Sequence, residues 1–175
     1  MKRLEEDTIR NTHEEVSDLD DKNNTVYVPR GYMGIIAAVD RTDRAKAVLE
    51  QAHRLAKAFD LPVYAVHVLN TSEFVELERT SVKETGKPIE MEKIKEVATD
   101  IAETKAAEVD GDGDVTAVGL VGSPSKEIVR YASDHDVQFI VVSPRKRSPT
   151  GKALFGSVAQ SVLLNSTCPV ITVTN

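Results

Sequence analysis

Short apolar runs bounded by polar residues recur along most of this chain. They are rich in valine, isoleucine and alanine and are short for buried helices, so we predict a strand at each run. The predicted strands cover residues 35–39, 63–69, 115–121, 138–142 and 170–173. His67 falls within the second run, where we expect a core or edge histidine rather than a metal ligand.

Between these runs, apolar residues recur at intervals of three and four, which places them on one face of a helix. The pattern is clearest over residues 45–59 and 91–109. Thr42 or Asp43 is suited to cap the first of these helices. Ser123, with a proline after it, is suited to start another helix.

Two segments complete the pattern. The signal is poor over residues 70–90, where we expect only a short helix that starts at Thr71. Gly156 and Ser157 are expected to start the last helix, after the basic segment 145–152. Strands that alternate with helices predict a parallel sheet covered on both faces, because right-handed crossovers join parallel neighbours. In such sheets, ligands bind beyond the carboxyl ends of the strands.

Composition and charge narrow the possible classes. The chain has 175 residues, 41% of them hydrophobic, which suits one domain with a core of ordinary size. Residues 1–24 carry eight acidic and four basic side chains, and the remainder carries 20 and 18. We expect a polar, flexible N-terminal extension over residues 1–33 and a domain over residues 34–175. A domain with so small a net charge is not expected to bind nucleic acid. No apolar run predicts a membrane segment and no signal pattern is present at Met1, so we expect a cytoplasmic protein.

The start of the last helix is a candidate anion site. The first turn of a helix leaves backbone N–H groups without partners and carries a partial positive charge. Gly156 allows a ligand to approach the backbone closely, and Ser157 adds a hydroxyl donor. Four cations precede this pair: Arg145, Lys146, Arg147 and Lys152. The segment therefore predicts a phosphate site, and the alternative is an ordinary helix cap after a solvated loop.

No motif predicts a catalyst or a metal site. The single cysteine, Cys168, excludes an internal disulfide and a cysteine-based metal cluster. The acidic segment 110–114 lacks the glycine and glutamate that an EF-hand needs at Val115 and Val121, so we expect a turn there. The segment 149–152 lacks two of the fixed positions of a Walker A loop.

The C-terminal part of the chain resembles the signature of the universal stress protein family. The residues that carry the resemblance are VVS, then twelve residues, then GSVAQSVLLNSTCPVITV. Ser143 and Lys146 stand where that signature has glycines. The resemblance covers residues 34–175 and implies a Rossmann-like, three-layer α/β/α fold with a five-stranded parallel sheet in the order 3-2-1-4-5.

The resemblance also implies a binding site for ATP or AMP, with or without Mg²⁺. By position, Asp40, which follows Ala38 and Val39, would approach the ribose, and Val68 would offer its backbone to adenine. The implied phosphate loop contains Val142, Ser143, Arg145 and Lys146. At the helix start, the implied phosphate ligands are Gly156, Ser157 and Val158. The resemblance implies a binding protein, with at most weak ATP hydrolysis, that forms a homodimer through the strand at residues 170–173.

Three functions are compatible with these features. The first is an adenine-nucleotide-binding stress-response or regulatory protein. The second is a nucleotide-free dimeric interaction module whose basic loop, residues 145–152, docks an acidic partner. Ser143 and Lys146 favour this second function because neither residue allows the backbone approach that glycine does. The third, a nucleotide-using electron-transfer or ligase-type enzyme, is supported only by the shared order of elements.

Overall fold

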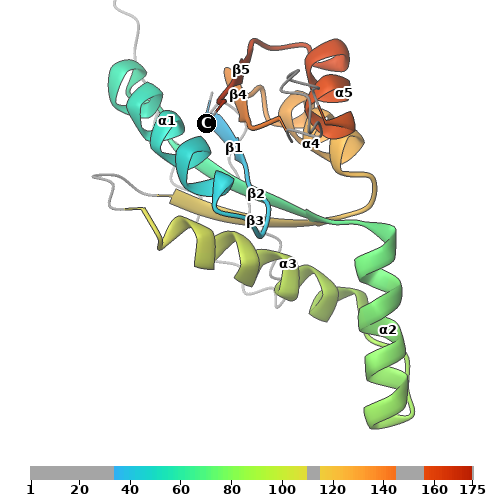
Figure 1. Ribbon diagram of the computed structural model, residues 1–175. Helices are drawn as coiled ribbons and strands as arrows, with labels where there is room; N and C mark the ends of the chain where they lie inside the picture. Colours follow the sequence, from blue (N-terminus) through green and yellow to red (C-terminus); the bar gives the residue numbers. More distant parts are fainter. Residues whose placement is uncertain (1–33, 110–114, 145–155, 175) are drawn as a thin grey trace, which may run out of the picture.

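The computed structural model describes residues 34–109, 115–144 and 156–174. The predicted extension at residues 1–33, the predicted turn at 110–114 and the basic loop at 145–152 lie outside these residues. The described strands form one parallel sheet in the order β3-β2-β1-β4-β5, which confirms the predicted fold (Figure 1). Their bounds are β1 Ile35–Ala38, β2 Val63–Leu69, β3 Val115–Val121, β4 Phe139–Val142 and β5 Val170–Thr172.

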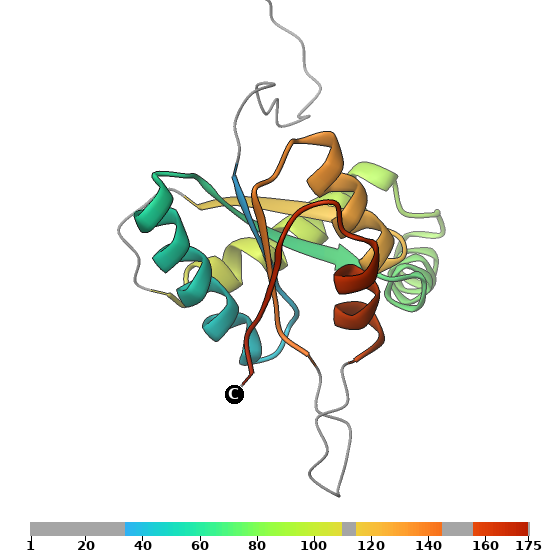
Figure 2. The ribbon, with the colours of Figure 1, turned by 90° about the horizontal axis from the view of Figure 1, so that it is seen from above.

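In the part of the chain that the structure describes, five helices connect the strands. Their bounds are α1 Arg44–Phe59, α2 Thr71–Thr85, α3 Met91–Ala106, α4 Pro124–Asp134 and α5 Ser157–Asn165. Figure 2 shows α1 and α5 on opposite sides of the strands. Buried residues of α1 and α3 pack on one face of the sheet, and those of α4 and α5 pack on the other. The result is the predicted three-layer arrangement.

Alternating residues of the strands supply both cores. In β1, Ile35 and Ala37 belong to the core under α1 and α3, whereas Ile36 belongs to the core under α4 and α5. All three side chains have no exposed surface. A strand buried on both faces needs apolar residues at every position, which explains why β1 is a continuous apolar run in the sequence.

The strand bounds agree with the predicted bounds to within one residue, whereas one helix is longer than predicted. β2 and β3 have the predicted bounds, and β1, β4 and β5 are each one residue shorter than predicted. The prediction of a short helix after β2 was wrong, because α2 has 15 residues. None of them is buried, so apolar periodicity gave little signal. In Figure 1, α2 projects away from the sheet.

Two residues predicted as helix caps occupy the N-cap positions but do not make the capping hydrogen bond. Asp43 and Ser123 occupy the N-cap positions of α1 and α4, yet neither side chain makes a capping hydrogen bond. The Thr42 hydroxyl instead donates to the Asp40 carboxylate. The polar residues that precede α1 are therefore organised around Asp40, at the carboxyl end of β1.

Candidate functional site

A cavity of about 470 Å³ lies at the carboxyl ends of β1, β2 and β4. This volume is within the range of about 300–1,000 Å³ that is usual for small-molecule sites. The sheet order reverses between β1 and β4, so the connections that leave these two strands go to opposite faces and leave a crevice between them. The cavity therefore occupies the place where this class of fold binds ligands.

The cavity gathers the predicted site residues that the structure describes. They are Ala38, Val39, Asp40, Val68, Val142, Ser143, Gly156, Ser157 and Val158. Arg145 and Lys146 lie outside the described residues. Residues separated by about a hundred positions thus meet around one space, and their role in binding a nucleotide remains a prediction.

Asp40 is held by its own loop. Its Oδ1 accepts hydrogen bonds from the Thr42 backbone N–H, at 3.0 Å, and from the Thr42 hydroxyl. Its Oδ2 accepts from Nη2 of Arg44, the first residue of α1, at 2.9 Å. Burial alone would raise the pKa of the Asp40 carboxyl, but the hydrogen bonds from Thr42 and Arg44 and the Arg44 charge hold that pKa below its ordinary 3.8. Asp40 is therefore an ionised acceptor at neutral pH.

The N-terminus of α5 lines the same cavity as Asp40. Gly156, Ser157 and Val158 of α5 and Pro124 of α4 all line it. The first bond of α5 runs from Gln160 N–H to the Gly156 carbonyl, so the N–H groups of the preceding residues have no intrahelical acceptor. Within the described residues, no side chain caps either helix. These N–H groups can serve an anionic ligand.

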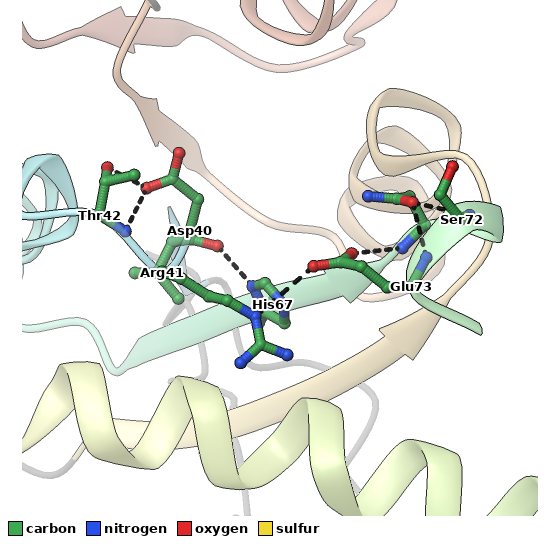
Figure 3. A network of polar contacts seen from close by, with 8 residues as sticks. Asp40, Arg41, Thr42, His67, Ser72 and Glu73 are labelled. Atoms are coloured by element: carbon green, nitrogen blue, oxygen red, sulfur yellow. Dashed lines mark hydrogen bonds and ion pairs between the residues drawn. The ribbon is translucent and has the colours of Figure 1, made fainter. Parts of the chain in front are cut away.

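The sequence prediction missed a polar network that is formed by Arg41, Asn70 and Glu73, which also line the cavity. Glu73 Oε2 accepts the Asn70 backbone N–H at 3.0 Å, and its Oε1 lies 3.5 Å from Arg41 Nε (Figure 3). The Asn70 side chain accepts from the N–H groups of Ser72 and Glu73, which completes a capping box. The spacing Asn-x-x-Glu was the available sequence signal.

His67 lies beneath this network. The residue is 4% exposed, as expected for a core histidine, and its Nδ1 is 3.0 Å from the Val39 carbonyl oxygen. Nε2 is buried and has no partner among the described residues. Burial lowers the pKa of His67 below its ordinary 6.5 and outweighs the opposing effects of the Val39 bond and the Glu73 charge.

The described residues contain neither a cluster of metal ligands nor a membrane-spanning helix. No group of three or more His, Cys, Asp or Glu side chains there could hold a metal ion. No helix there combines the length and the apolar composition needed to cross a bilayer.

The fold and the cavity define a Rossmann-like α/β domain with a ligand-sized cavity where the strand order reverses. The sequence model of the universal stress protein family matches residues 31–174, so the chain belongs to that family. Universal stress protein MJ0531 of Methanocaldococcus jannaschii is 30% identical over 150 residues, which are 81% of this chain and 82% of that protein.

Solved structures agree with this assignment. A universal stress protein from Archaeoglobus fulgidus is 34% identical, with a TM-score of 0.51 over 82% of this chain and 99% of that one. The hypothetical protein MJ0577 is 26% identical, with a TM-score of 0.60 over 82% of this chain and 96% of that one. A universal stress protein solved in complex with cAMP is 18% identical, with a TM-score of 0.54 over 82% and 97%, a likeness that shows the fold alone.

Proposed function

We propose that this chain binds an adenine nucleotide, ATP or AMP, in the cavity at the carboxyl ends of β1 and β4, and acts as a cytoplasmic stress-response or regulatory protein. The observation that carries the proposal is the pairing of opposite chemistries within one cavity. Asp40 offers an ionised acceptor, and the N-terminus of α5 offers backbone N–H donors to the same cavity.

These two features suit the two polar parts of a nucleotide. Ribose hydroxyls donate hydrogen bonds, and an ionised carboxylate accepts strong ones. Phosphate oxygens accept hydrogen bonds and carry negative charge, which a helix N-terminus favours. Ile128 and Val142 add an apolar wall to the same cavity, which suits a flat base.

The state of Asp40 supports binding rather than catalysis. A general base works best with a pKa near the operating pH. Thr42 and Arg44 hold the pKa of Asp40 below its ordinary value, so this carboxylate is a weak base and a good acceptor. We propose that hydrolysis of ATP, with or without Mg²⁺, is at most slow.

Isothermal titration calorimetry with ATP and AMP, with and without Mg²⁺, tests the proposal. Asp40→Ala should weaken binding about tenfold, since it removes a hydrogen bond to a charged group. Ser157→Glu should weaken binding at least about tenfold, because it places a carboxylate at the phosphate end of the cavity.

Gln160→Glu is the matched control. It adds the same charge on the exposed side of the same helix, at a residue that is not part of the cavity wall, and should change affinity less than about twofold. Absence of binding heat with the parent protein, or an equal loss in Gln160→Glu and Ser157→Glu, would reject the proposed site.

Ser143 gives one reason to keep the nucleotide-free interaction module as a second candidate. It lines the cavity with a side chain where the family signature has a glycine. In that case an acidic partner should be captured with strong salt dependence, and ATP should not compete.

A further inference from the structure

We propose that His67 is a positioning residue for the nucleotide site. Its Nδ1–H donates a hydrogen bond to the Val39 carbonyl, and this bond ends the β1–β2 ladder and fixes the position of Asp40 at the cavity. The inference rests on the proposed function for its ligand, but the contact itself belongs to the ligand-free protein.

The bond fixes the tautomer of His67. A carbonyl oxygen can only accept, so the ring nitrogen 3.0 Å from the Val39 oxygen carries the hydrogen. In the neutral ring, Nε2 is then a bare acceptor, and it is buried without a partner among the described residues. Burying an unpartnered acceptor is costly, so the site retains His67 at the expense of stability.

The same bond takes the place of a backbone hydrogen bond between β1 and β2. The last register pair of β1 and β2 is Ala38 with Val66, and the Val39 N–H still donates to the Val66 carbonyl at 2.9 Å. The next rung of a parallel ladder would run from the Val68 N–H to the Val39 carbonyl. No such bond joins these two described residues, and the imidazole of His67 takes the carbonyl instead.

Two consequences meet at the cavity. Val39 has both backbone groups fixed by β2, so the direction in which Asp40 leaves the strand is fixed as well. The backbone N–H of Val68 is on the β1 side of β2, beyond the last hydrogen bond of the ladder, and Val68 lines the cavity. The imidazole thus presents a carboxylate and a backbone donor together, which match a ribose hydroxyl and an acceptor nitrogen of the base.

His67→Asn and His67→Gln form a matched pair for the test. The asparagine amide nitrogen, like Nδ1 of histidine, is separated from Cβ by one carbon and can donate to Val39. The glutamine amide nitrogen is one carbon further and cannot replace it in the same place. Both variants are polar and uncharged, so burial of a polar group is common to the pair.

The first measurement uses no ligand. Titration of the Asp40 carboxyl by carbon-13 NMR should give the same low pKa in the parent and in His67→Asn, and a pKa closer to the ordinary 3.8 in His67→Gln. Nitrogen-15 shifts of His67 in the parent should show the Nδ1–H tautomer. An Nε2–H tautomer, or an Asp40 titration that is unchanged in His67→Gln, would overturn the inference.

The second measurement compares ATP with 2′,3′-dideoxy-ATP by calorimetry. His67→Gln should bind ATP about five- to tenfold more weakly, the effect of about one hydrogen bond, and should lose much of the preference for ATP over the dideoxy analogue. His67→Asn should keep both. A general loss of packing would weaken the binding of both ligands equally, and that result would overturn the inference. Equal losses of ATP affinity in His67→Asn and His67→Gln would overturn it as well. If the parent binds neither nucleotide, the proposed function fails, while the carboxyl titration still decides the role of His67.

Discussion

At the scale of single residues, the feature that departs most from an ordinary core is His67. It is the buried polar residue among the described ones, and charges surround it. Arg41 and the carboxylates of Glu73 and Asp40 act on it in opposite directions, and burial outweighs them, so the pKa of His67 is below 6.5. The folded state therefore prefers the neutral ring.

This preference predicts an acid-sensitive stability. The neutral ring contributes its full stability above pH 6.5, where the folded and unfolded chains are both unprotonated. As the pH falls below 6.5, the unfolded chain binds a proton first, so the free energy of unfolding falls, by at most about 1.4 kcal/mol per pH unit, until the pH passes the folded pKa.

His67→Asn removes this titration, and urea denaturation at pH 7.5 and pH 5.5 measures it. The parent should lose more stability between these two values than the variant does. The Asp40 contribution does not interfere, because its pKa is lowered from 3.8 and that stability is lost only at more acidic pH. Equal losses in parent and variant would show that His67 does not titrate in this window.

The sequence predicted the residues of the site better than their bonds. Asp40 was singled out because it follows a strand end and Gly156 because it starts a helix, and both line the cavity at the carboxyl edge of the sheet. The bond from His67 to Val39 was not predictable, because it depends on where the β1–β2 ladder stops. The Arg41–Glu73 ion pair was missed for a similar reason, since it joins a loop to a helix that the sequence barely indicated.

At the scale of elements, α2 shows what burial patterns leave out. None of its 15 residues is fully buried, and only Phe74 and Leu77 among them pack, partly buried, against a described core cluster, so the core holds α2 less firmly than the other helices. Its ends are well defined instead: the capping box of Asn70 and Glu73 starts it, and Gly86, at a φ of 72°, ends it. Continuous apolar runs predicted β2 and β3 to the residue, because β2 is buried throughout and β3 packs partly buried side chains against the core. The apolar pattern failed for α2 because the signals of this helix are local.

Asn70→Ala should therefore loosen α2 without unfolding the domain. The variant loses two hydrogen bonds to the N–H groups of Ser72 and Glu73, and removal of such a cap costs about 1 kcal/mol. Hydrogen exchange should accelerate about fivefold in the amides of α2 and remain unchanged in those of β2.

Glu73→Gln separates the cap from the ion pair. The glutamine oxygen can still accept the Asn70 N–H, while the charge opposite Arg41 is lost. This variant should leave exchange in α2 nearly unchanged, because exposed ion pairs contribute little. Faster exchange throughout the domain in Asn70→Ala would contradict the local role of this cap.

At the scale of the whole molecule, the sheet has two edges, β3 and β5. On either side of β5, the Pro169 carbonyl accepts from the Ile140 N–H and the Val173 N–H donates to the Val142 carbonyl, so the odd-numbered residues bond to β4. Backbone groups alternate in direction along a strand, so Val170 and Thr172 turn theirs to the outer edge. An edge of this kind can pair with a second copy about a two-fold axis, which we propose as the dimer contact.

Thr172→Pro tests that contact without touching the bonds to β4. Proline removes an outward N–H and is tolerated on edge strands, so the fold should remain. A two-fold contact loses the bond in both copies, so the dimer dissociation constant should rise at least about tenfold, as sedimentation at micromolar concentrations would measure. Thr172→Val, which keeps the N–H and the strand preference, should associate like the parent. A dimer that survives Thr172→Pro unchanged would exclude β5 and direct attention to the β3 edge, and a parent that sediments as a monomer would exclude the dimer itself.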